Sequence, residues 1–231
     1  MEYVKLNNGV EMPILGFGVY QIPKEETKEC VLNAIKVGYR LIDTAQSYFN
    51  ESEVGEAISE CGVPREELFI TTKVWIDNYG YDKCKASILE SLKKLKTDYI
   101  DLVLLHQPFS DYYGAYRALE DLYHEGKIRA IGVSNFYPDR LADICLFGRK
   151  VIPAVNQVET NPFNQQVKAQ ENMEKYGVHI EAWAPFGEGK SGMFENVTLK
   201  KIGEKYGKSV AQVILRWLIQ RGVIVVCKST H

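Results

Sequence analysis

Cysteine and long apolar runs are both scarce in this chain of 231 residues. The five cysteines are an odd number, lie far apart and form no C-x-x-C pair, and no histidine stands near them at metal-ligand spacing. The longest apolar runs, at residues 102–105 and 223–227, are far shorter than the roughly 18 residues that span a bilayer. The sequence therefore predicts reduced, mostly structural thiols, no bound metal and no membrane segment.

Net charge is scarce as well, because 28 basic residues face 30 acidic ones and leave a formal charge of −2. A nucleic-acid-binding protein needs a basic field that such a chain does not provide. The N-terminal residues lack the charged and then apolar regions of a secretory signal, which predicts a cytoplasmic protein. With 45% apolar residues and no Ser/Gly/Pro-rich linker, we expect one domain over residues 1–231.

Helix-like and strand-like segments alternate along the chain. Helical patterns cover residues 25–37, 51–60, 82–95, 116–125, 139–146, 165–176 and 209–220. Strand-like runs cover residues 15–18, 41–43, 69–73, 99–106, 128–134, 154–159, 179–183 and 223–227. Most of these runs are continuously apolar, which is typical of parallel strands that are covered on both faces.

Eight strand–helix units in about 230 residues favour a closed (β/α)8 TIM barrel, with an open, doubly wound sheet as the alternative. Before the first unit, residues 3–13 read as a β-hairpin with an Asn8-Gly9 turn. We expect the hairpin either to plug one end of the barrel or to pack on its outside.

Polar or aromatic side chains end seven successive strand candidates, at the edge where such a barrel builds its active site. These residues are Asp43, Lys73, His106, Ser134 with Asn135, Gln157 with Glu159, Trp183, and Lys228 with Ser229. Each one alone has a structural explanation, such as a turn cap, a solvated strand end or a satisfied partly buried imidazole. Together they predict an active site.

Tyr48 follows Asp43 on the same loop and completes a chemically sensible set. A phenol with a pKa of about 10 becomes a better proton donor when a nearby ammonium stabilises its anion, so we expect Lys73 to lower the pKa of Tyr48. Asp43 would hold that ammonium, and His106 would hydrogen-bond and polarise a substrate carbonyl. The residues alone indicate proton transfer to a carbonyl; they show no nucleophile motif, metal cluster or P-loop.

The segment GYRLIDTAQSY at residues 38–48, followed by Asn50-Glu51, resembles the signature of the aldo-keto reductase family. TKVW (72–75), LLHQP (104–108), IGVSNF (131–136), NQ (156–157) and KS (228–229) resemble later blocks of the family in the same order. The resemblance covers essentially the whole chain and is closest to small bacterial-type members that act on dicarbonyls and simple aldehydes.

This resemblance implies an NADPH-dependent reduction of small aldehydes, ketones or dicarbonyls to alcohols. Because members of the family are mostly monomeric, it also implies a monomer. It implies that Tyr48 is the general acid, that Lys73 and Asp43 tune it, and that His106 orients the carbonyl. The resemblance also implies that Ser134, Asn135 and Gln157 bind the nicotinamide carboxamide and that Trp183 stacks on the nicotinamide ring. It implies that Lys228, Ser229 and Thr230 bind the 2′-phosphate. The other cofactor residues implied are Gly18, Val19, Tyr20, Asp43, Ala184 and Phe186. The substrate residues implied are Tyr20, Trp75, His106 and Phe109, although core packing is an equally good explanation of Trp75.

Three positions depart from the family pattern. Ala184 follows Trp183 where a small hydroxyl residue is common, which would remove one pyrophosphate contact. Cys227 stands where proline is usual. Gln107 replaces the tryptophan of many animal members, which would make the pocket less aromatic and suit small polar substrates.

Two alternatives to an active reductase remain open at the level of sequence. The first is a non-catalytic cofactor-binding or scaffold member of the family, which retention of all four of Asp43, Tyr48, Lys73 and His106 disfavours. The second is an inactive fragment, because the sequence stops four residues after Cys227 and we expect the last helix and the C-terminal loop to be missing. If His231 is the natural terminus, we expect weak cofactor affinity, low stability and little activity; if it is not, the reductase interpretation applies to the parent protein.

Overall fold

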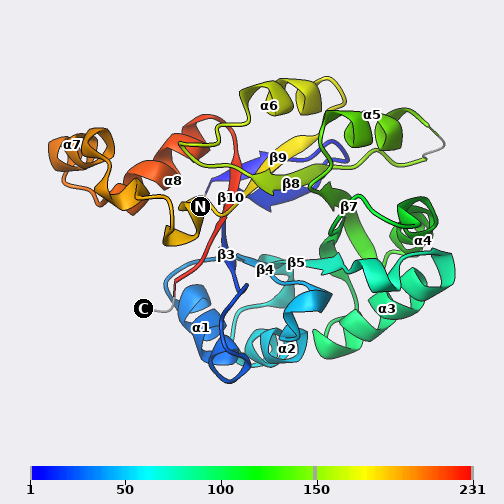
Figure 1. Ribbon diagram of the computed structural model, residues 1–231. Helices are drawn as coiled ribbons and strands as arrows, with labels where there is room; N and C mark the ends of the chain where they lie inside the picture. Colours follow the sequence, from blue (N-terminus) through cyan, green and yellow to red (C-terminus); the bar gives the residue numbers. More distant parts are fainter. Residues whose placement is uncertain (1, 148–149, 230–231) are drawn as a thin grey trace.

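Eight parallel strands close into a barrel in the computed structural model, which describes residues 2–147 and 150–229 (Figure 1). Around the barrel the strands follow the order β10-β3-β4-β5-β6-β7-β8-β9. Their bounds are β3 Leu15–Gly18, β4 Leu41–Asp43, β5 Phe69–Val74, β6 Ile100–Leu105, β7 Ile128–Ser134, β8 Val155–Glu159, β9 His179–Trp183 and β10 Ile224–Cys227. The predicted (β/α)8 barrel is confirmed over the open sheet.

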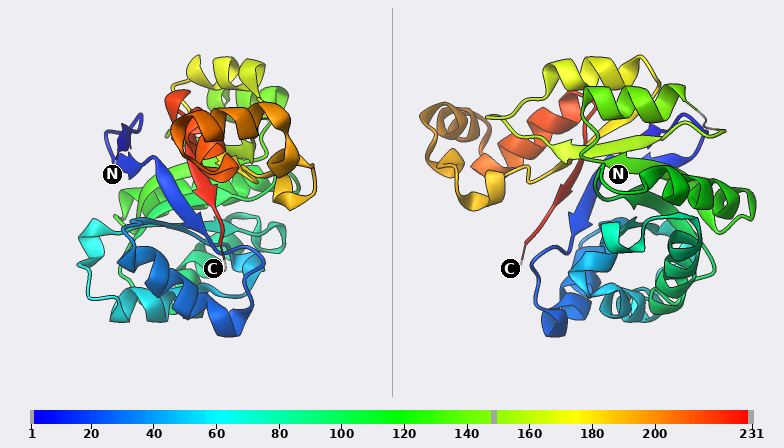
Figure 2. Two further views of the ribbon diagram at one scale, coloured as in Figure 1. Left: turned by 90° about the vertical axis from the view of Figure 1, so that its left-hand side faces the viewer. Right: turned by 45° about the vertical axis from the view of Figure 1, so that its right-hand side comes forward.

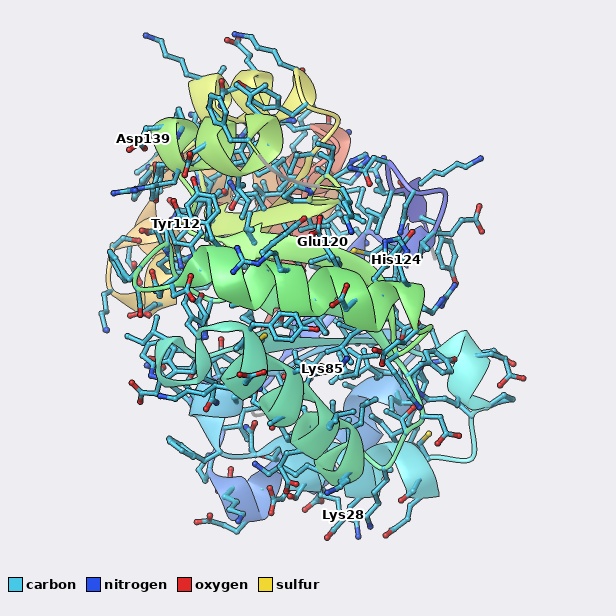
Figure 3. All side chains as sticks on the ribbon, turned by 90° about the vertical axis from the view of Figure 1, so that its right-hand side faces the viewer. Lys28, Lys85, Tyr112, Glu120, His124 and Asp139 are labelled. Carbon is cyan, nitrogen blue, oxygen red and sulfur yellow. The ribbon has the colours of Figure 1, made fainter. Side chains whose placement is uncertain are left out.

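Helices cover the outside of the barrel. They are α1 Lys24–Lys36, α2 Glu51–Glu60, α3 Tyr81–Lys94, α4 Tyr112–His124, α5 Pro138–Leu146, α6 Val167–Glu174, α7 Val197–Tyr206 and α8 Val210–Gln220. Short 3₁₀ turns lie at η1 Gln46–Tyr48, η2 Arg65–Glu67, η3 Ile76–Asn78, η4 Gly187–Gly189 and η5 Met193–Glu195. Figure 3 shows α3 and α4 side by side, where Lys85 Nζ lies 2.7 Å from Glu125 Oε1.

One helix, α7, has no counterpart among the predicted segments; it lies farthest from the strands and packs against α8 (Figures 1 and 2). Gly203 is its buried residue, although Leu199, Ile202 and Tyr206 stand at helical spacing in its sequence. Its ends are also marked: the Asn196 side chain accepts the N–H groups of Thr198 and Leu199, and Gly207 ends the helix in the left-handed region at φ 63°.

The strands are buried on both faces, as their continuously apolar sequences predict. Every residue of β4, β5 and β6 is buried. One apolar layer lies between strands and helices and includes Tyr116 and Leu119 of α4. A smaller layer fills the inside of the barrel and includes Leu102 and Leu104 of β6. These layers fix the strand ends and so position what projects from them.

The predicted hairpin pairs β1 Tyr3–Lys5 with β2 Glu11–Pro13 and closes one end of the barrel. Met12 is completely buried and packs with the interior layer. The Asn7 side chain donates to the carbonyl oxygen of Pro153, just before β8. The Asn8 side chain donates to the carbonyl oxygen of Arg129, near the start of β7. The hairpin therefore plugs the N-terminal mouth and leaves the opposite mouth of the barrel open to a ligand.

Among the described residues, no helix combines the length and the apolar character that a bilayer crossing requires.

Candidate active site

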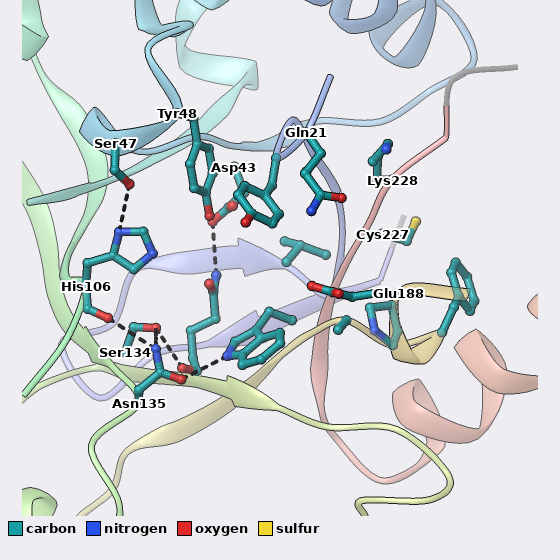
Figure 4. Close-up of a pocket in the computed structure, with 18 of the residues that line it drawn as sticks. Gln21, Asp43, Ser47, Tyr48, His106, Ser134, Asn135, Glu188, Cys227 and Lys228 are labelled. Carbon is teal, nitrogen blue, oxygen red and sulfur yellow. Dashed lines mark hydrogen bonds between the residues drawn. The ribbon is translucent and has the colours of Figure 1, made fainter. Parts of the chain in front are cut away.

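A cavity of about 730 Å³ opens at the C-terminal mouth of the barrel (Figure 4). It is lined by Gly18, Tyr20, Gln21, Asp43, Ser47, Tyr48, Trp75, His106, Gln107, Ser134, Asn135, Gln157, Trp183, Ala184, Pro185, Phe186, Glu188, Gly189, Phe194, Val226, Cys227 and Lys228. In the view of Figure 4, His106 lies at one end of the cavity, whereas Glu188, Cys227 and Lys228 lie at the other. The lining combines hydrogen-bonding groups with aromatic rings, as small-molecule sites do.

Lys73 is completely buried beside the cavity and uses all three of its N–H groups. Its Nζ lies 2.6 Å from Asp43 Oδ1, 3.0 Å from the carbonyl oxygen of Thr44 and 3.3 Å from Tyr48 Oη. The second oxygen of Asp43 accepts a hydrogen bond from Gln157 Nε2 at 3.0 Å. The ammonium is thus held against the phenol by a carboxylate that is itself fixed from β8.

Opposing effects set the pKa values of this group. Burial is the largest single effect and lowers the pKa of Lys73, but the neighbouring acidic groups, Asp43 foremost, together outweigh it; the net shift is upward and the ammonium stays charged. Burial raises the pKa of Tyr48, and the Lys73 ammonium opposes that rise without cancelling it. The ammonium lowers the pKa of Tyr48, as expected, but burial is the larger effect and the net shift is upward. Tyr48 therefore holds its proton at neutral pH.

His106 faces Tyr48 and Trp75 edge-on, with ring centroids 5.8 and 5.1 Å away. Burial, with a smaller contribution from the Lys73 charge, lowers the pKa of His106 to about 3. The imidazole is therefore neutral at physiological pH and carries a single proton. Its Nδ1 lies 3.4 Å from the hydroxyl of Ser47 (Figure 4). A donor at Nδ1 would leave the proton on Nε2, the other ring nitrogen.

Asn135 ties the far wall of the cavity together from the end of β7. Its backbone is left-handed at φ 62°, a conformation that asparagine tolerates better than most residues. The side-chain amide donates to the His106 carbonyl oxygen and to Ser134 Oγ, both at 3.2 Å. Its oxygen accepts from Trp183 Nε1 at 3.0 Å. The Asn135 side chain therefore links the backbone at His106 to the indole ring of Trp183.

The donor set at this wall fits a nicotinamide cofactor. Ser134, Asn135 and Gln157 offer the hydroxyl and amide groups that a carboxamide needs, and all three line the cavity. The half-buried ring of Trp183 lines the same cavity and supplies a flat surface. The exposed ammonium of Lys228 stands at the rim, where a phosphate can meet it. Two large aromatic rings, Phe186 and Phe194, lie 5.6 Å apart on the segment after β9.

Not every residue predicted for the site reaches the cavity lining. Val19 is buried in the outer apolar layer, where its N–H meets the carbonyl oxygen of Asp43. Phe109 is 58% exposed and lies outside the lining, as does Ser229. Thr230 falls outside the residues that the structure describes. Lys73 lies behind Tyr48, in keeping with a tuning role.

Several lining residues carried no sequence prediction as site residues. Ser47 directly precedes Tyr48 in the chain, so adjacency to the predicted acid could have marked it; Gln107 had been expected in the pocket only as a departure from the family pattern. Pro185, Glu188, Gly189 and Phe194 belong to the segment between β9 and α7, which has no periodic pattern. That segment carries left-handed residues at Ala184 and Glu188, a loop geometry that only the folded chain displays.

The aldo/keto reductase family model matches residues 14–231. Glyoxal reductase of Bacillus subtilis is 49% identical over 228 residues, which are 98% of this chain and 82% of that protein. Methylglyoxal reductase DkgA of Escherichia coli K12 is 40% identical over 229 residues, with 98% and 82% covered. The crystal structure of a Bombyx mori aldo-keto reductase in complex with NADP superimposes with a TM-score of 0.94 at 36% identity, over 100% of this chain and 84% of that one.

These relatives are reductases, and the non-catalytic alternative is therefore not favoured. The barrel, the cavity at its C-terminal mouth and the family match agree on one class of chemistry, the reduction of carbonyl groups with a nicotinamide cofactor, NAD(P)H. The chain belongs to the aldo/keto reductase family.

Proposed function

We propose that this protein reduces small aldehydes and dicarbonyls of the glyoxal and methylglyoxal class to hydroxy compounds, with NADPH as reductant and Tyr48 as the proton donor. The observation that carries the proposal is the hydrogen bond from the buried Lys73 ammonium to the Tyr48 hydroxyl at 3.3 Å, inside the cavity wall. Binding alone needs no phenol poised on an ammonium. The names of the two bacterial relatives support the substrate class.

The proton-transfer step follows from the contacts of Tyr48. Reduction adds a hydride to the carbonyl carbon and a proton to its oxygen; the bound nicotinamide cofactor would supply the hydride. Tyr48 gives its phenolic proton to the oxygen and becomes a phenolate. The Lys73 ammonium stabilises that anion, and Asp43 keeps the ammonium in place.

His106 orients the substrate carbonyl in this mechanism. Donation from the Ser47 hydroxyl to Nδ1 keeps the imidazole proton on Nε2, from which it can be donated to the carbonyl oxygen. The neutral state of His106 suits this role, since an imidazolium would bring a second positive charge beside Lys73. Tyr48 and His106 would thus both donate a hydrogen bond to the same carbonyl oxygen of the substrate.

Cofactor choice, pocket chemistry and setting complete the proposal. Lys228 at the rim supports NADPH over NADH, because a cation there can pair with the 2′-phosphate. Ser47 and Gln107 give the substrate end hydroxyl and amide groups that suit a small polar dicarbonyl. All five cysteines are free thiols, which supports a reducing compartment such as the cytoplasm. We expect a monomer, which light scattering after size exclusion would test.

The test is steady-state reduction of glyoxal and methylglyoxal with NADPH and with NADH, in the wild type and in Tyr48→Phe. We expect a preference for NADPH, and a kcat in Tyr48→Phe that is about 10²–10⁴-fold lower, the usual contribution of a positioned general acid. Cofactor fluorescence should show that the variant still binds NADPH.

The matched control is Tyr116→Phe. This tyrosine is also buried, but it lies on α4 with its hydroxyl on the Val151 carbonyl oxygen, away from the cavity. Its kcat should stay within about twofold of the wild type, because surface and scaffold hydroxyls do not touch the reaction. Undiminished turnover in Tyr48→Phe would refute the role of Tyr48.

A further inference from the structure

Glu181 is a buried acid that the mechanism above does not use. It lies on β9, in register with Gln157 of β8 and Ile224 of β10. Its neighbours Ile180 and Ala182 belong to the outer apolar layer, so by strand alternation Glu181 faces the inside of the barrel. Its side chain is 0% exposed, and within the described part of the chain neither carboxyl oxygen meets a hydrogen-bond partner.

The donors around Glu181 are directed mainly at other groups. The three N–H groups of Lys73 go to Asp43, Thr44 and Tyr48, and Gln157 gives one of its two amide N–H groups to Asp43. An ionised carboxylate in this place would be a buried charge with no donor but the second N–H of Gln157 among these groups, which is a costly arrangement in a protein. A neutral carboxylic acid avoids that cost.

The charges that face Glu181 favour the same state. Asp43 on β4 is a carboxylate and Lys73 on β5 an ammonium, while β8 contributes the uncharged Gln157 and β10 the apolar Ile224. Burial raises the pKa of Glu181 to about 8; the Asp43 charge adds to the rise, whereas the Lys73 charge and the Gln157 amide oppose it. Lys73 cannot neutralise both acids, since its hydrogen bonds select Asp43.

We propose that Glu181 is a positioning residue that serves carbonyl reduction as a neutral acid beside the Asp43–Lys73 pair, and that its ionisation switches Tyr48 to a weaker proton donor. With Glu181 neutral, the buried pair carries no net charge. With Glu181 ionised, the same site carries one negative charge, just where reduction forms a phenolate on Tyr48. Like charges in a medium of low dielectric repel strongly, so the barrier rises.

The inference rests on the proposed function and predicts an alkaline limb in reduction that belongs to Glu181. In the wild type, kcat for glyoxal reduction at saturating NADPH should fall about tenfold from pH 7 to pH 9, since one unit charge nearby is worth at least that factor. In Glu181→Gln, which keeps the shape and remains neutral, the ratio of kcat at the two pH values should stay within about twofold.

Glu120→Gln is the matched control for this experiment. Glu120 is a buried carboxylate on α4 that accepts the backbone N–H of Val151, outside the cavity. Its pH profile should have the shape of the wild-type profile. The inference is overturned if Glu181→Gln keeps the full alkaline decline, because that decline would then belong to Tyr48 or to the cofactor.

A second readout does not depend on activity. The pKa of Glu181 is raised in the folded protein, whereas an unfolded glutamate titrates near pH 4.3. Between those two values the folded state holds the extra proton, so the stability of the wild type relative to Glu181→Gln should fall as pH rises, and level off above about pH 8. Denaturant midpoints from pH 4 to 9 measure this difference.

The two readouts separate the possible failures. If the wild type does not turn over dicarbonyls but the stability difference follows the predicted slope, the proposed function fails and the neutral acid stands. If turnover is normal and the stability difference is independent of pH, Glu181 is ionised throughout and the inference fails by itself.

Discussion

The two ends of the barrel both bury an aspartate against positive charge, yet they do so for different purposes. At the N-terminal end, Asp101 of β6 accepts from Arg65 at 2.8 Å, Arg129 at 2.6 Å and the backbone N–H of Ile70 at 2.9 Å. At the C-terminal end, Asp43 holds an ammonium that also touches a phenol on the cavity wall. The Asp101 cluster stabilises the fold, because its hydrogen bonds are all made within the protein. The Asp43 cluster can also take part in proton transfer, because it includes the Tyr48 hydroxyl on the cavity wall.

The hairpin reinforces this difference. It seals the N-terminal end with apolar side chains such as Met12, so Asp101 is remote from any cavity ligand. The opposite mouth opens into the cavity; Asp43 lines that cavity, and Glu181 is buried close enough to Asp43 for their charges to interact. The same residue types therefore support stability at one end and reactivity at the other.

The largest effect that would test this comparison is the removal of the N-terminal joint. Asp101→Ala leaves the Ile70 N–H without its acceptor and two guanidinium groups without a carboxylate. We expect the free energy of unfolding to fall by about 3 kcal/mol, the lower end for a broken buried pair, because Arg65 and Arg129 remain 19% and 42% exposed. Urea denaturation measures this, and kcat below the melting temperature should change less than about twofold.

Asp139→Ala provides the control for Asp101→Ala. Asp139 is 80% exposed, and its oxygen lies 3.8 Å from Arg140. Losing such a surface contact at a helix start should cost less than about 1 kcal/mol. A large loss of kcat in Asp101→Ala with intact stability would contradict the separation of the two ends.

A smaller effect should follow from Ser47→Ala at the reactive end. Without the hydroxyl, Nδ1 of His106 loses its partner and the two neutral tautomers become closer in energy. A neutral hydrogen bond of 3.4 Å is at the weak end of its class, so we expect kcat to fall about threefold with KM little changed. Ser47→Thr, which retains a hydroxyl, should preserve kcat. Imidazole ¹⁵N shifts that report the same tautomer in all three proteins would count against this role.

The smallest expected effect is that kcat/KM stays constant at mildly acidic pH. Since the pKa of His106 is lowered to about 3, kcat/KM should not change through His106 titration between pH 5 and 7. The sign for stability is the opposite of that for Glu181: an unfolded histidine gains a proton near pH 6.5, so wild-type stability relative to His106→Gln should fall as pH drops from about 6.5 toward 3. An inflection of kcat/KM near pH 6.5 that is absent from His106→Gln would show a titrating imidazole.

Much of the fold was predictable because it repeats. Seven of the helices named above and the eight barrel strands coincide with patterns of apolar residues, since each unit must bury one face against the next. The helix α7 was not predicted, although Leu199, Ile202 and Tyr206 stand at helical spacing in its sequence. The asparagine cap at Asn196 and the glycine stop at Gly207 were further signals.

Part of the candidate site could also be predicted. Asp43, Tyr48 and His106 line the cavity, with Lys73 beside it, because strand ends of a barrel converge on one mouth. Glu181 was not predicted, because the sequence does not show whether a glutamate two residues before the end of a strand has a hydrogen-bond partner in the fold. The loop residue Glu188 was missed because loops carry no periodic signal.

By itself, the sequence determined which segments become strands and helices, that the strands run parallel, and that polar groups stand at their C-terminal ends, because apolar periodicity and chain order encode these features locally. Only the tertiary structure decided that the hairpin plugs the N-terminal mouth, that the hydrogen bonds of Lys73 go to Asp43, Thr44 and Tyr48, and that Glu181 is buried without a hydrogen bond of its own. Those facts depend on which groups from distant strands meet in a closed, water-poor space, where burial and charge act over a few ångströms.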